Sequence, residues 1–292
     1  MPRFSGKPQR LIAAGLLILA TGSSLSVTPA AGVTRHKLLV IIEENHSQAQ
    51  ALSQMPYLAS LANRYGRATA YAGVAHPSLP NYLAIGGGST YGVTDDKGPT
   101  AHPISGPSVF GQTLALGLTA KTYAESMPGN CKIPGGTTYA IRHNEWTYFT
   151  KERAACDAND VPLGTLSAGA LRDDARLGHL PVTGQITPNV CNDGHDCSLA
   201  TADTWLKGWM ARLLAGPDYT SGNLTIIVTF DEDDRVSGNN VAFVVVDPRL
   251  SGRVVTLPAT HYSLTRWYED NAGAAHLNNA AAARDLKVAF GL

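Results

Sequence analysis

Three short apolar runs without alternating polar residues lie along the chain, at 37–42, 224–230 and 241–246. Runs of this length that are rich in Val, Ile and Leu are typical of strands buried on both faces. A further short strand is predicted at 120–124, after the helical stretch that ends at residue 116. The chain therefore carries the elements of a largely buried sheet.

Stretches with helical spacing of apolar residues lie between these runs, at 56–65, 79–85, 108–116, 203–214 and 261–271. In the fourth of them Trp205, Leu206, Trp209 and Leu213 recur near the helical period. Apolar strands that alternate with helices predict an α/β fold, with a mostly parallel central sheet and helices on both faces.

Residues 125–200 have a different character, being rich in Gly, Pro, Asn and Asp with little periodicity. We interpret them as an irregular insertion or lid on the sheet domain. All four cysteines lie there, and pairing of sequence neighbours predicts the disulfides Cys131–Cys156 and Cys191–Cys197.

The first thirty residues predict a secretory signal peptide, with a basic front, a short apolar run at 11–20 and small residues before a cleavage site after Ala30. Residues 31–292 would then form a single domain of a secreted protein. They hold 20 basic and 23 acidic residues, a formal charge of −3, and no later segment is apolar enough for stable membrane insertion. The balanced charge argues against a nucleic-acid partner.

Polar clusters follow two of the predicted strands directly. Glu43, Glu44 and Asn45 come after the first run, and the acidic run 231–234 follows residue 230. Sites in open α/β sheets form beyond the carboxyl ends of the strands. Carboxylate and amide oxygens suit Mg²⁺, Ca²⁺ or Mn²⁺, and adjacent carboxylates repel one another unless solvent or a cation relieves them. The pattern indicates a divalent metal site or, alternatively, solvated strand ends.

Ser78 lies at the start of the predicted helix 79–85, within the stretch His76-Pro77-Ser78-Leu79-Pro80-Asn81-Tyr82. Free N–H groups and the helix dipole there favour bound anions and an ionised nucleophile. Ser78 is thus a candidate nucleophile, and a plain capping serine is the alternative. Asn81 is a candidate for binding phosphate oxygens, or it simply packs.

Two histidines complete the candidate chemistry. His195 lies in the stretch Asn192-Asp193-Gly194-His195-Asp196 and is placed to protonate a leaving oxygen, while Asp193 orients it or binds metal. His261 opens the last predicted helix and is a candidate for lining the pocket and binding substrate. A structural loop histidine remains the alternative.

The pieces E-E-N-H-S (43–47), H-P-S-L-P-N-Y-L-A (76–84), N-D-G-H-D (192–196), T-F-D-E-D-D (229–234) and H-Y-S-L (261–264), in this order, resemble the phosphoesterase family of secreted acid phosphatases and phospholipases C. That family belongs to the alkaline-phosphatase-like superfamily, and the likeness is greatest to actinobacterial secreted acid phosphatases. The resemblance implies one divalent metal held by Glu44, Asn45, Asp231 and Glu232. Ser78 would be the transiently phosphorylated nucleophile and would also touch the metal. Which of Asp231, Glu232 and Asp233 binds metal stays open.

The sequence therefore predicts a secreted, metal-dependent acid phosphatase that hydrolyses phosphomonoesters through a phosphoserine. Its substrates would be small phosphate esters or phosphorylated lipid head groups. A phospholipase C-type phosphodiesterase is one alternative, and a catalytically inactive phosphate-binding protein on the same fold is another.

Overall fold

Buried strands of branched apolar residues build the centre of the molecule. In the computed structural model, which describes residues 1–6 and 35–292, β1 (Lys37–Glu43) and β7 (Leu224–Phe230) are buried along almost their whole length. They are neighbours in an eight-stranded sheet of order β5-β4-β6-β1-β7-β8-β2-β9. The other strands of this sheet are β2 (Gly66–Ala68), β4 (Ala120–Ala124), β5 (Asp160–Pro162), β6 (Thr183–Thr187), β8 (Phe243–Val246) and β9 (Arg253–Val255). Apart from its first six residues, the predicted signal peptide lies outside the described residues.

The sheet is mostly parallel, as predicted. Strand β1 runs parallel to both β6 and β7, and only β8 runs antiparallel to its neighbours β7 and β2. A separate two-stranded parallel ribbon joins β3 (Tyr71–Ala72) to β10 (Ala259–Thr260). The carboxyl ends of β6, β1 and β7 therefore meet at one edge of the sheet.

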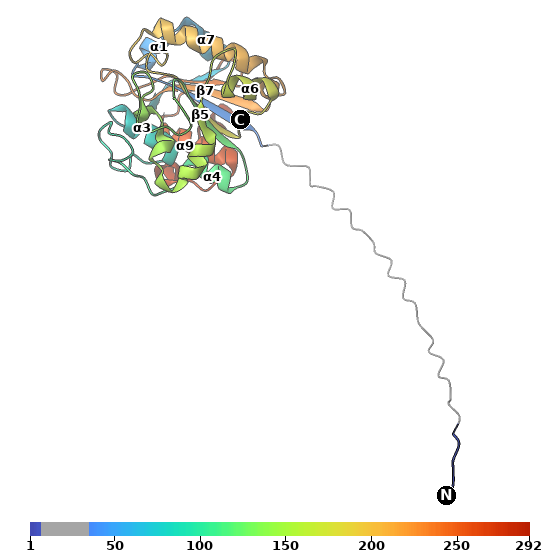
Figure 1. Cartoon of the computed structure of the whole chain (residues 1–292). Helices are drawn as coiled ribbons and strands as arrows, with labels where there is room; N and C mark the ends of the chain where they lie inside the picture. The colour runs from blue at the N-terminus through green and yellow to red at the C-terminus, as the bar shows by residue number, and fades with distance from the viewer. Residues whose placement is uncertain (7–34) are drawn as a thin grey trace. The chain divides into compact units, whose positions relative to one another are not determined.

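Helices cover both faces of the sheet (Figure 1). One group packs together from α1 (Gln48–Gln54), α2 (Pro56–Arg64), α6 (Ala170–Leu177), α7 (Leu199–Ala215) and α8 (Pro217–Thr220). The other consists of α3 (Ser78–Gly87), α4 (Val109–Ala115), α9 (His261–Ala272) and α10 (Leu286–Phe290). This arrangement confirms the predicted fold class. No helix in the described ranges combines the length and apolarity that crossing a membrane requires.

Local capping explains where the observed helices depart from the predicted bounds. Helix α7 begins at Leu199 because the side chain of Ser198 accepts a hydrogen bond from the Thr201 N–H. Helix α3 ends where Gly88 adopts a left-handed conformation, at φ 69°. Helix α1 escaped prediction, although Ser47 and Gln50 form a capping box at its start.

Residues 125–200 both cover the sheet and contribute to it. They contain the short 3₁₀ turns η1 (Ile141–His143), η2 (Glu145–Tyr148) and η3 (Thr150–Glu152), helix α5 (Arg153–Asn159) and the irregular loops expected from their composition. They also supply β5 and β6, and β6 is fully buried between β4 and β1. The sequence indicates only a possible strand end at 185–188, because this strand carries Thr and Gln on a buried sheet.

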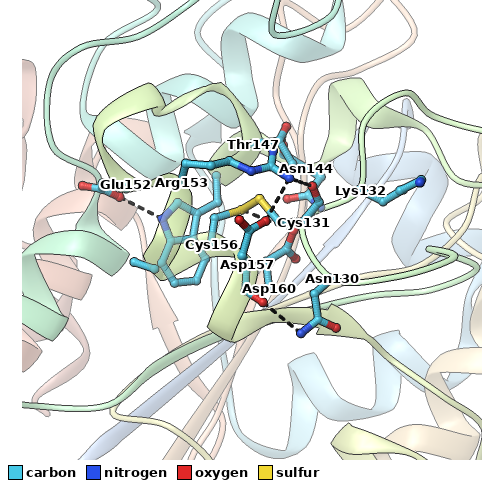
Figure 2. The surroundings of a disulfide bond; sticks show 12 residues. Asn130, Cys131, Lys132, Asn144, Thr147, Glu152, Arg153, Cys156, Asp157 and Asp160 are labelled. Carbon is cyan, nitrogen blue, oxygen red and sulfur yellow. Dashed lines mark hydrogen bonds and ion pairs between the residues drawn. A yellow bond between two sulfur atoms is a disulfide. The ribbon is translucent and has the colours of Figure 1, made fainter.

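Both predicted disulfides are present, linking Cys131 to Cys156 and Cys191 to Cys197. The first lies beside Asp160, whose carboxylate accepts a hydrogen bond of 2.8 Å from the Asn144 side chain (Figure 2). Asn144 follows directly on η1, so this disulfide and Asp160 anchor the irregular segment that carries His143.

Candidate active site

Backbone hydrogen bonds draw three strand ends together at the carboxyl edge of the sheet. The Glu44 N–H donates to the Asp193 carbonyl at 2.9 Å, which joins the end of β1 to the loop after β6. The Asp231 N–H donates to the Glu43 carbonyl at 3.1 Å, which joins the end of β7 to β1. Residues that are 149 and 188 positions apart in the sequence thereby lie side by side, as the parallel topology requires.

Ser78 is the first residue of α3 and is only 2% exposed. Its hydroxyl donates to Glu44 Oε2 at 3.1 Å. The other carboxylate oxygen, Oε1, accepts a 2.7 Å hydrogen bond from the Tyr82 hydroxyl, one turn further along α3. The predicted nucleophile and the predicted metal ligand are therefore in direct contact.

Four buried carboxylates surround this contact, and burial is the main cause of their altered pKa values. Burial, followed by the charge of Asp231, raises the pKa of Glu44 well above its usual value. Burial likewise raises the pKa of Asp193, of Asp231 and of Glu232 to about 8 in each case. Such a cluster of acidic groups is stabilised by a cation.

Unpartnered oxygen atoms point to the same conclusion. Asn45 Oδ1, Asp193 Oδ2 and Asp231 Oδ2 are buried and accept no hydrogen bond from the described residues. Asn45 adopts a left-handed conformation, at φ 45°, which Asn tolerates better than most residues. Leaving a buried acceptor unmatched costs about 1–3 kcal/mol, which a bound cation would offset. These oxygen donors suit a hard divalent ion.

His143 is buried in the same cluster, between two of the carboxylates. Its Nε2 lies 3.1 Å from Glu44 Oε1, and its Nδ1 lies 3.5 Å from Asp193 Oδ2. Donor atoms of these three side chains lie within 4.8 Å of one another, so they form a second possible metal group. Burial, and next the charge of Arg142, lowers the pKa of His143 well below its usual value, which favours the neutral ring.

A pocket of about 350 Å³ opens onto this cluster. Its lining residues are Asn45, Pro77, Ser78, Asp96, His195, Glu232, Asp233, Asp234 and Arg235. His195 is placed in it by two contacts: Nδ1 lies 2.7 Å from Asp196 Oδ1, and Nε2 lies 3.2 Å from an Arg142 guanidinium nitrogen. Its backbone N–H also donates to Asp193 Oδ1 at 2.8 Å, so Asp193 orients the loop that carries His195.

The acidic run 231–234 divides into two pairs. Asp231 is fully buried, and its Oδ1 accepts from the Asn45 N–H at 3.5 Å, whereas Glu232 Oε2 lies 2.6 Å from His76 Nδ1. Asp233 instead accepts hydrogen bonds from the N–H groups of Arg235, Ser237 and Asn239, while Asp234 accepts one from the Gln50 side chain. The second pair therefore shapes the loop 233–239, although Asp233 Oδ1 also lies 3.4 Å from His76 Nε2.

Two predicted substrate-binding residues, Asn81 and His261, do not line this pocket. Asn81 is fully buried, and its side chain binds the backbone of residues 74, 75 and 77, which fixes the turn before Ser78. His261 is also fully buried: Nε2 donates to the Asp231 carbonyl and Nδ1 accepts from the Tyr71 hydroxyl. Burial lowers its pKa to about 4. Neither side chain lines the pocket. The polar atoms of Asn81 and His261 are already hydrogen-bonded to the backbone and to the Tyr71 hydroxyl, so they are not free to bind a substrate.

Sequence reasoning gave no site role to Arg142, His143 and Asp96. Arg142 and His143 lie in the irregular segment, where no periodicity fixes the direction of a side chain. The sequence does contain a signal, since an Arg-His pair between disulfide-linked cysteines is a cluster of potential phosphate-binding groups. Asp96 lines the pocket and accepts a 3.0 Å hydrogen bond from the Leu79 N–H at the start of α3.

Comparison with known sequences places this geometry in a family. A sequence model of the Phosphoesterase family matches residues 45–237, about two thirds of the chain. The chain belongs to the phosphoesterase family. A Mycobacterium tuberculosis (strain ATCC 25618 / H37Rv) protein named phosphatidylinositol-3-phosphatase is 30% identical over 275 residues, which cover 90% of this chain and 86% of that protein. The resemblance inferred from the sequence is confirmed, and so is the enzyme class, a phosphoric monoester hydrolase of the acid phosphatase type.

The fungal phosphoesterase relatives are longer. The phosphate-repressible acid phosphatase of Penicillium chrysogenum is 28% identical over 227 residues, and the match covers 74% of this chain but 54% of that protein. Among solved structures, an alkaline phosphatase superfamily protein from Vibrio parahaemolyticus superposes with a TM-score of 0.58 at 12% identity, over 87% of this chain and 70% of that one. A lipoteichoic acid synthase from Listeria monocytogenes gives 0.59 at 10% identity, over 86% and 77%. These likenesses show that the fold is shared.

Proposed function

We propose that the chain is a secreted, metal-dependent acid phosphatase that hydrolyses phosphomonoesters through a phosphoserine at Ser78. The observation that supports this best is the contact of the Ser78 hydroxyl with Glu44, at a helix start that is surrounded by buried carboxylates. Ser78 lines the pocket, so its hydroxyl is accessible to a phosphate ester bound there. The relatives named acid phosphatases agree with the same chemistry.

We propose that Glu44, Asn45, Ser78, Asp231 and Glu232 hold the divalent metal. Glu44 Oε2 faces Ser78, whereas Oε1 is already engaged by Tyr82 and faced by His143. His143 presents a different nitrogen to each of its carboxylates, so it is better placed to bridge Glu44 and Asp193 than to bind an ion. When bound, the metal would lower the pKa of the serine hydroxyl and offset the charge of the phosphate.

In the first step the Ser78 oxygen forms a bond to phosphorus while the bond to the alcohol oxygen breaks. The serine proton leaves through its hydrogen bond to Glu44. His195, which lines the pocket, gives a proton to the leaving oxygen after its Nε2 parts from the Arg142 guanidinium, from which it accepts here, and takes up a proton. In the second step water attacks the phosphoserine, the serine oxygen recovers a proton, and phosphate is released.

The substrate class is proposed to include small phosphate esters and phosphorylated lipid head groups. The pocket lies beside the loop tip 235–237, where Arg235 is exposed and Val236 is 75% exposed. A basic and an apolar residue side by side suit a phosphate that is attached to an apolar body. The name of the mycobacterial relative makes a phosphoinositide the first lipid to test.

One panel tests the proposal. We expect the secreted chain to hydrolyse p-nitrophenyl phosphate at acid pH, to lose this activity in EDTA, and to regain it with a hard divalent ion. A phosphatidylinositol 3-phosphate arm tests the lipid head group, and a phosphatidylcholine arm tests the phospholipase C alternative. If metal-loaded protein turns over none of these esters between pH 4 and 9, an inactive phosphate-binding protein is the better description.

Secretion has its own test. We propose that residues 1–30 are removed on export, in keeping with the two disulfides, which form in oxidising compartments. Amino-terminal sequencing of the protein from culture medium should read Ala31-Gly32-Val33. Retention of the whole chain inside the cell would contradict the proposal.

A further inference from the structure

Three acids of the buried cluster each have one carboxylate oxygen beside a nitrogen of the protein. Asp231 Oδ1 accepts from the Glu232 N–H at 2.6 Å, and Asp193 Oδ1 accepts from the His195 N–H at 2.8 Å. Glu232 Oε2 lies 2.6 Å from His76 Nδ1. The Oδ2 atoms of both aspartates are buried and accept no hydrogen bond from the described residues. Each of these carboxylates therefore has a single oxygen left for an ion.

Glu44 shows the same division, and here a side chain imposes it. Its Oε1 accepts from the Tyr82 hydroxyl at 2.7 Å and lies 3.1 Å from His143 Nε2. Its Oε2 accepts from the Ser78 hydroxyl at 3.1 Å and keeps a lone pair for an ion. The Tyr82 ring is fully buried and stacks on the His143 ring, with centroids 5.1 Å apart and 9° between the planes. This packing holds the Tyr82 hydroxyl on Oε1.

The number of oxygens that a carboxylate presents affects which ion a site suits. Ca²⁺ takes about six to eight oxygen ligands, and a carboxylate can bind it through both oxygens. Mg²⁺ is smaller, requires near-ideal octahedral geometry and keeps several of its waters. Mn²⁺ also suits oxygen ligands in octahedral geometry. Carboxylates that each present one oxygen therefore favour the smaller, octahedral ions.

We propose that Tyr82 is a positioning residue that makes Glu44 a one-oxygen ligand, so that the site prefers Mg²⁺ or Mn²⁺ to Ca²⁺. The inference rests on the proposed function, because it concerns the metal of the same site. Without the Tyr82 hydroxyl, Oε1 would be free to bind the ion together with Oε2, which is the arrangement that suits Ca²⁺. Hydrogen-bond partners of metal ligands act in this way on other sites, by orienting the ligand.

Isothermal titration of the full secreted protein, stripped of metal by chelation and free of substrate, measures the affinity for each of the three ions. Wild type should bind Mg²⁺ and Mn²⁺ more tightly than Ca²⁺. Tyr82→Phe removes only the hydroxyl and keeps the ring that stacks on His143. It should weaken Mg²⁺ binding by about 10–100-fold, the usual effect of losing such a partner. Ca²⁺ binding should weaken less, so the ratio of the two affinities should move toward Ca²⁺ by about tenfold or more.

Tyr268→Phe is the matched control. Tyr268, on α9, is also fully buried, and its hydroxyl donates to the Gly184 carbonyl at 3.0 Å. Both variants lose one buried hydrogen bond of a tyrosine, but only Tyr82 contacts a proposed metal ligand. The Mg²⁺ to Ca²⁺ ratio of Tyr268→Phe should match that of wild type. Partial loss of the fold would weaken both ions alike, so the ratio separates a positioning role from a structural one.

Two results would overturn the inference. One is an affinity of wild type for Ca²⁺ that equals or exceeds its affinity for Mg²⁺, a measurement that needs no variant. The other is an unchanged ratio in folded Tyr82→Phe. Failure of the proposed function looks different. Ions bound in the expected order with zero turnover would contradict catalysis alone, whereas no binding of any ion would contradict the proposed metal dependence and this inference with it.

Discussion

At the residue scale, the site depends on polar atoms that have few partners of their own. Ser78 is in contact with Glu44, whereas the free oxygens of Asn45, Asp193 and Asp231 lack donors among the described residues. Asn81 and His261 show the opposite arrangement, because the amide of Asn81 and the ring nitrogens of His261 are hydrogen-bonded to neighbouring groups of the protein. Residues of the first kind have polar atoms that are free to bind a ligand. Asn81 and His261 instead hold neighbouring parts of the site in position.

Ser78→Ala should abolish most turnover. If the serine attacks phosphorus, the loss should be on the order of 10³-fold or more in kcat, while the fold survives the loss of one hydrogen bond, worth about 1 kcal/mol. Acid quench of wild type with labelled substrate should trap phosphate on the peptide that contains Ser78. Ser89→Ala, just beyond the end of α3, is the control. Retention of more than about a tenth of wild-type activity in folded Ser78→Ala would indicate direct attack by water.

A paired substitution tests the division of the acidic run. Asp231→Asn should lose bound metal, as measured by mass spectrometry of the purified protein, because the variant removes a charged ligand. Asp233→Asn should keep metal but destabilise the fold by about 1–3 kcal/mol, since an amide nitrogen replaces one of the two oxygens that accept from three backbone N–H groups. The reverse pattern, with metal lost only from Asp233→Asn, would move the metal site to the other pair.

At the scale of elements, the disulfides act on different lengths of chain. Cys131–Cys156 spans 25 residues and encloses η1, which carries His143, whereas Cys191–Cys197 spans only six. Closing a longer loop restricts the unfolded chain more strongly. Asp160 reinforces the first bridge by accepting a hydrogen bond from Thr122 and another from Asn144, which Figure 2 shows.

Replacing each pair of cysteines by serine tests this difference. We expect both double variants to be less stable, with a loss near 2–4 kcal/mol for Cys131/Cys156 and about 1 kcal/mol less for the short bridge. Urea unfolding at one pH measures both. Thiol titration of denatured, unreduced wild type should find no free cysteine. If the 191/197 variant proves the less stable, then local contacts and not loop length govern these bridges.

At the scale of the whole molecule, many buried carboxyl groups make stability depend on pH. Glu269 on α9 lies away from the candidate metal residues, and burial raises its pKa to about 8. Its value in the unfolded chain is near 4.5, so the folded protein holds the extra proton. Folding stability should therefore fall as pH rises from about 4.5 to 8, by up to roughly 1.4 kcal/mol per unit for this group.

Glu269→Gln removes this titration but keeps an oxygen for the Leu277 N–H. The variant should gain stability over wild type by roughly 1–3 kcal/mol between pH 5.5 and 7.5, as urea midpoints would show. Asp157→Asn, at an exposed carboxylate of α5, should give no such trend. A constant difference between Glu269→Gln and wild type across this range would mean that Glu269 is already ionised in the folded protein.

The sequence by itself determined the main strands, the longer helices and the disulfide pairs, because these follow from local periodicity, capping and spacing. It also determined that Glu44, Asn45, Ser78, Asp231 and His195 lie near one another, because parallel strands bring their carboxyl ends to one edge. Tertiary structure alone decided what the polar side chains of Asn81, His261 and Asp233 bind, since a hydrogen bond depends on the position of backbone far away in sequence. The same holds for the burial of β6 and of His143, which depends on neighbours that are distant in the sequence.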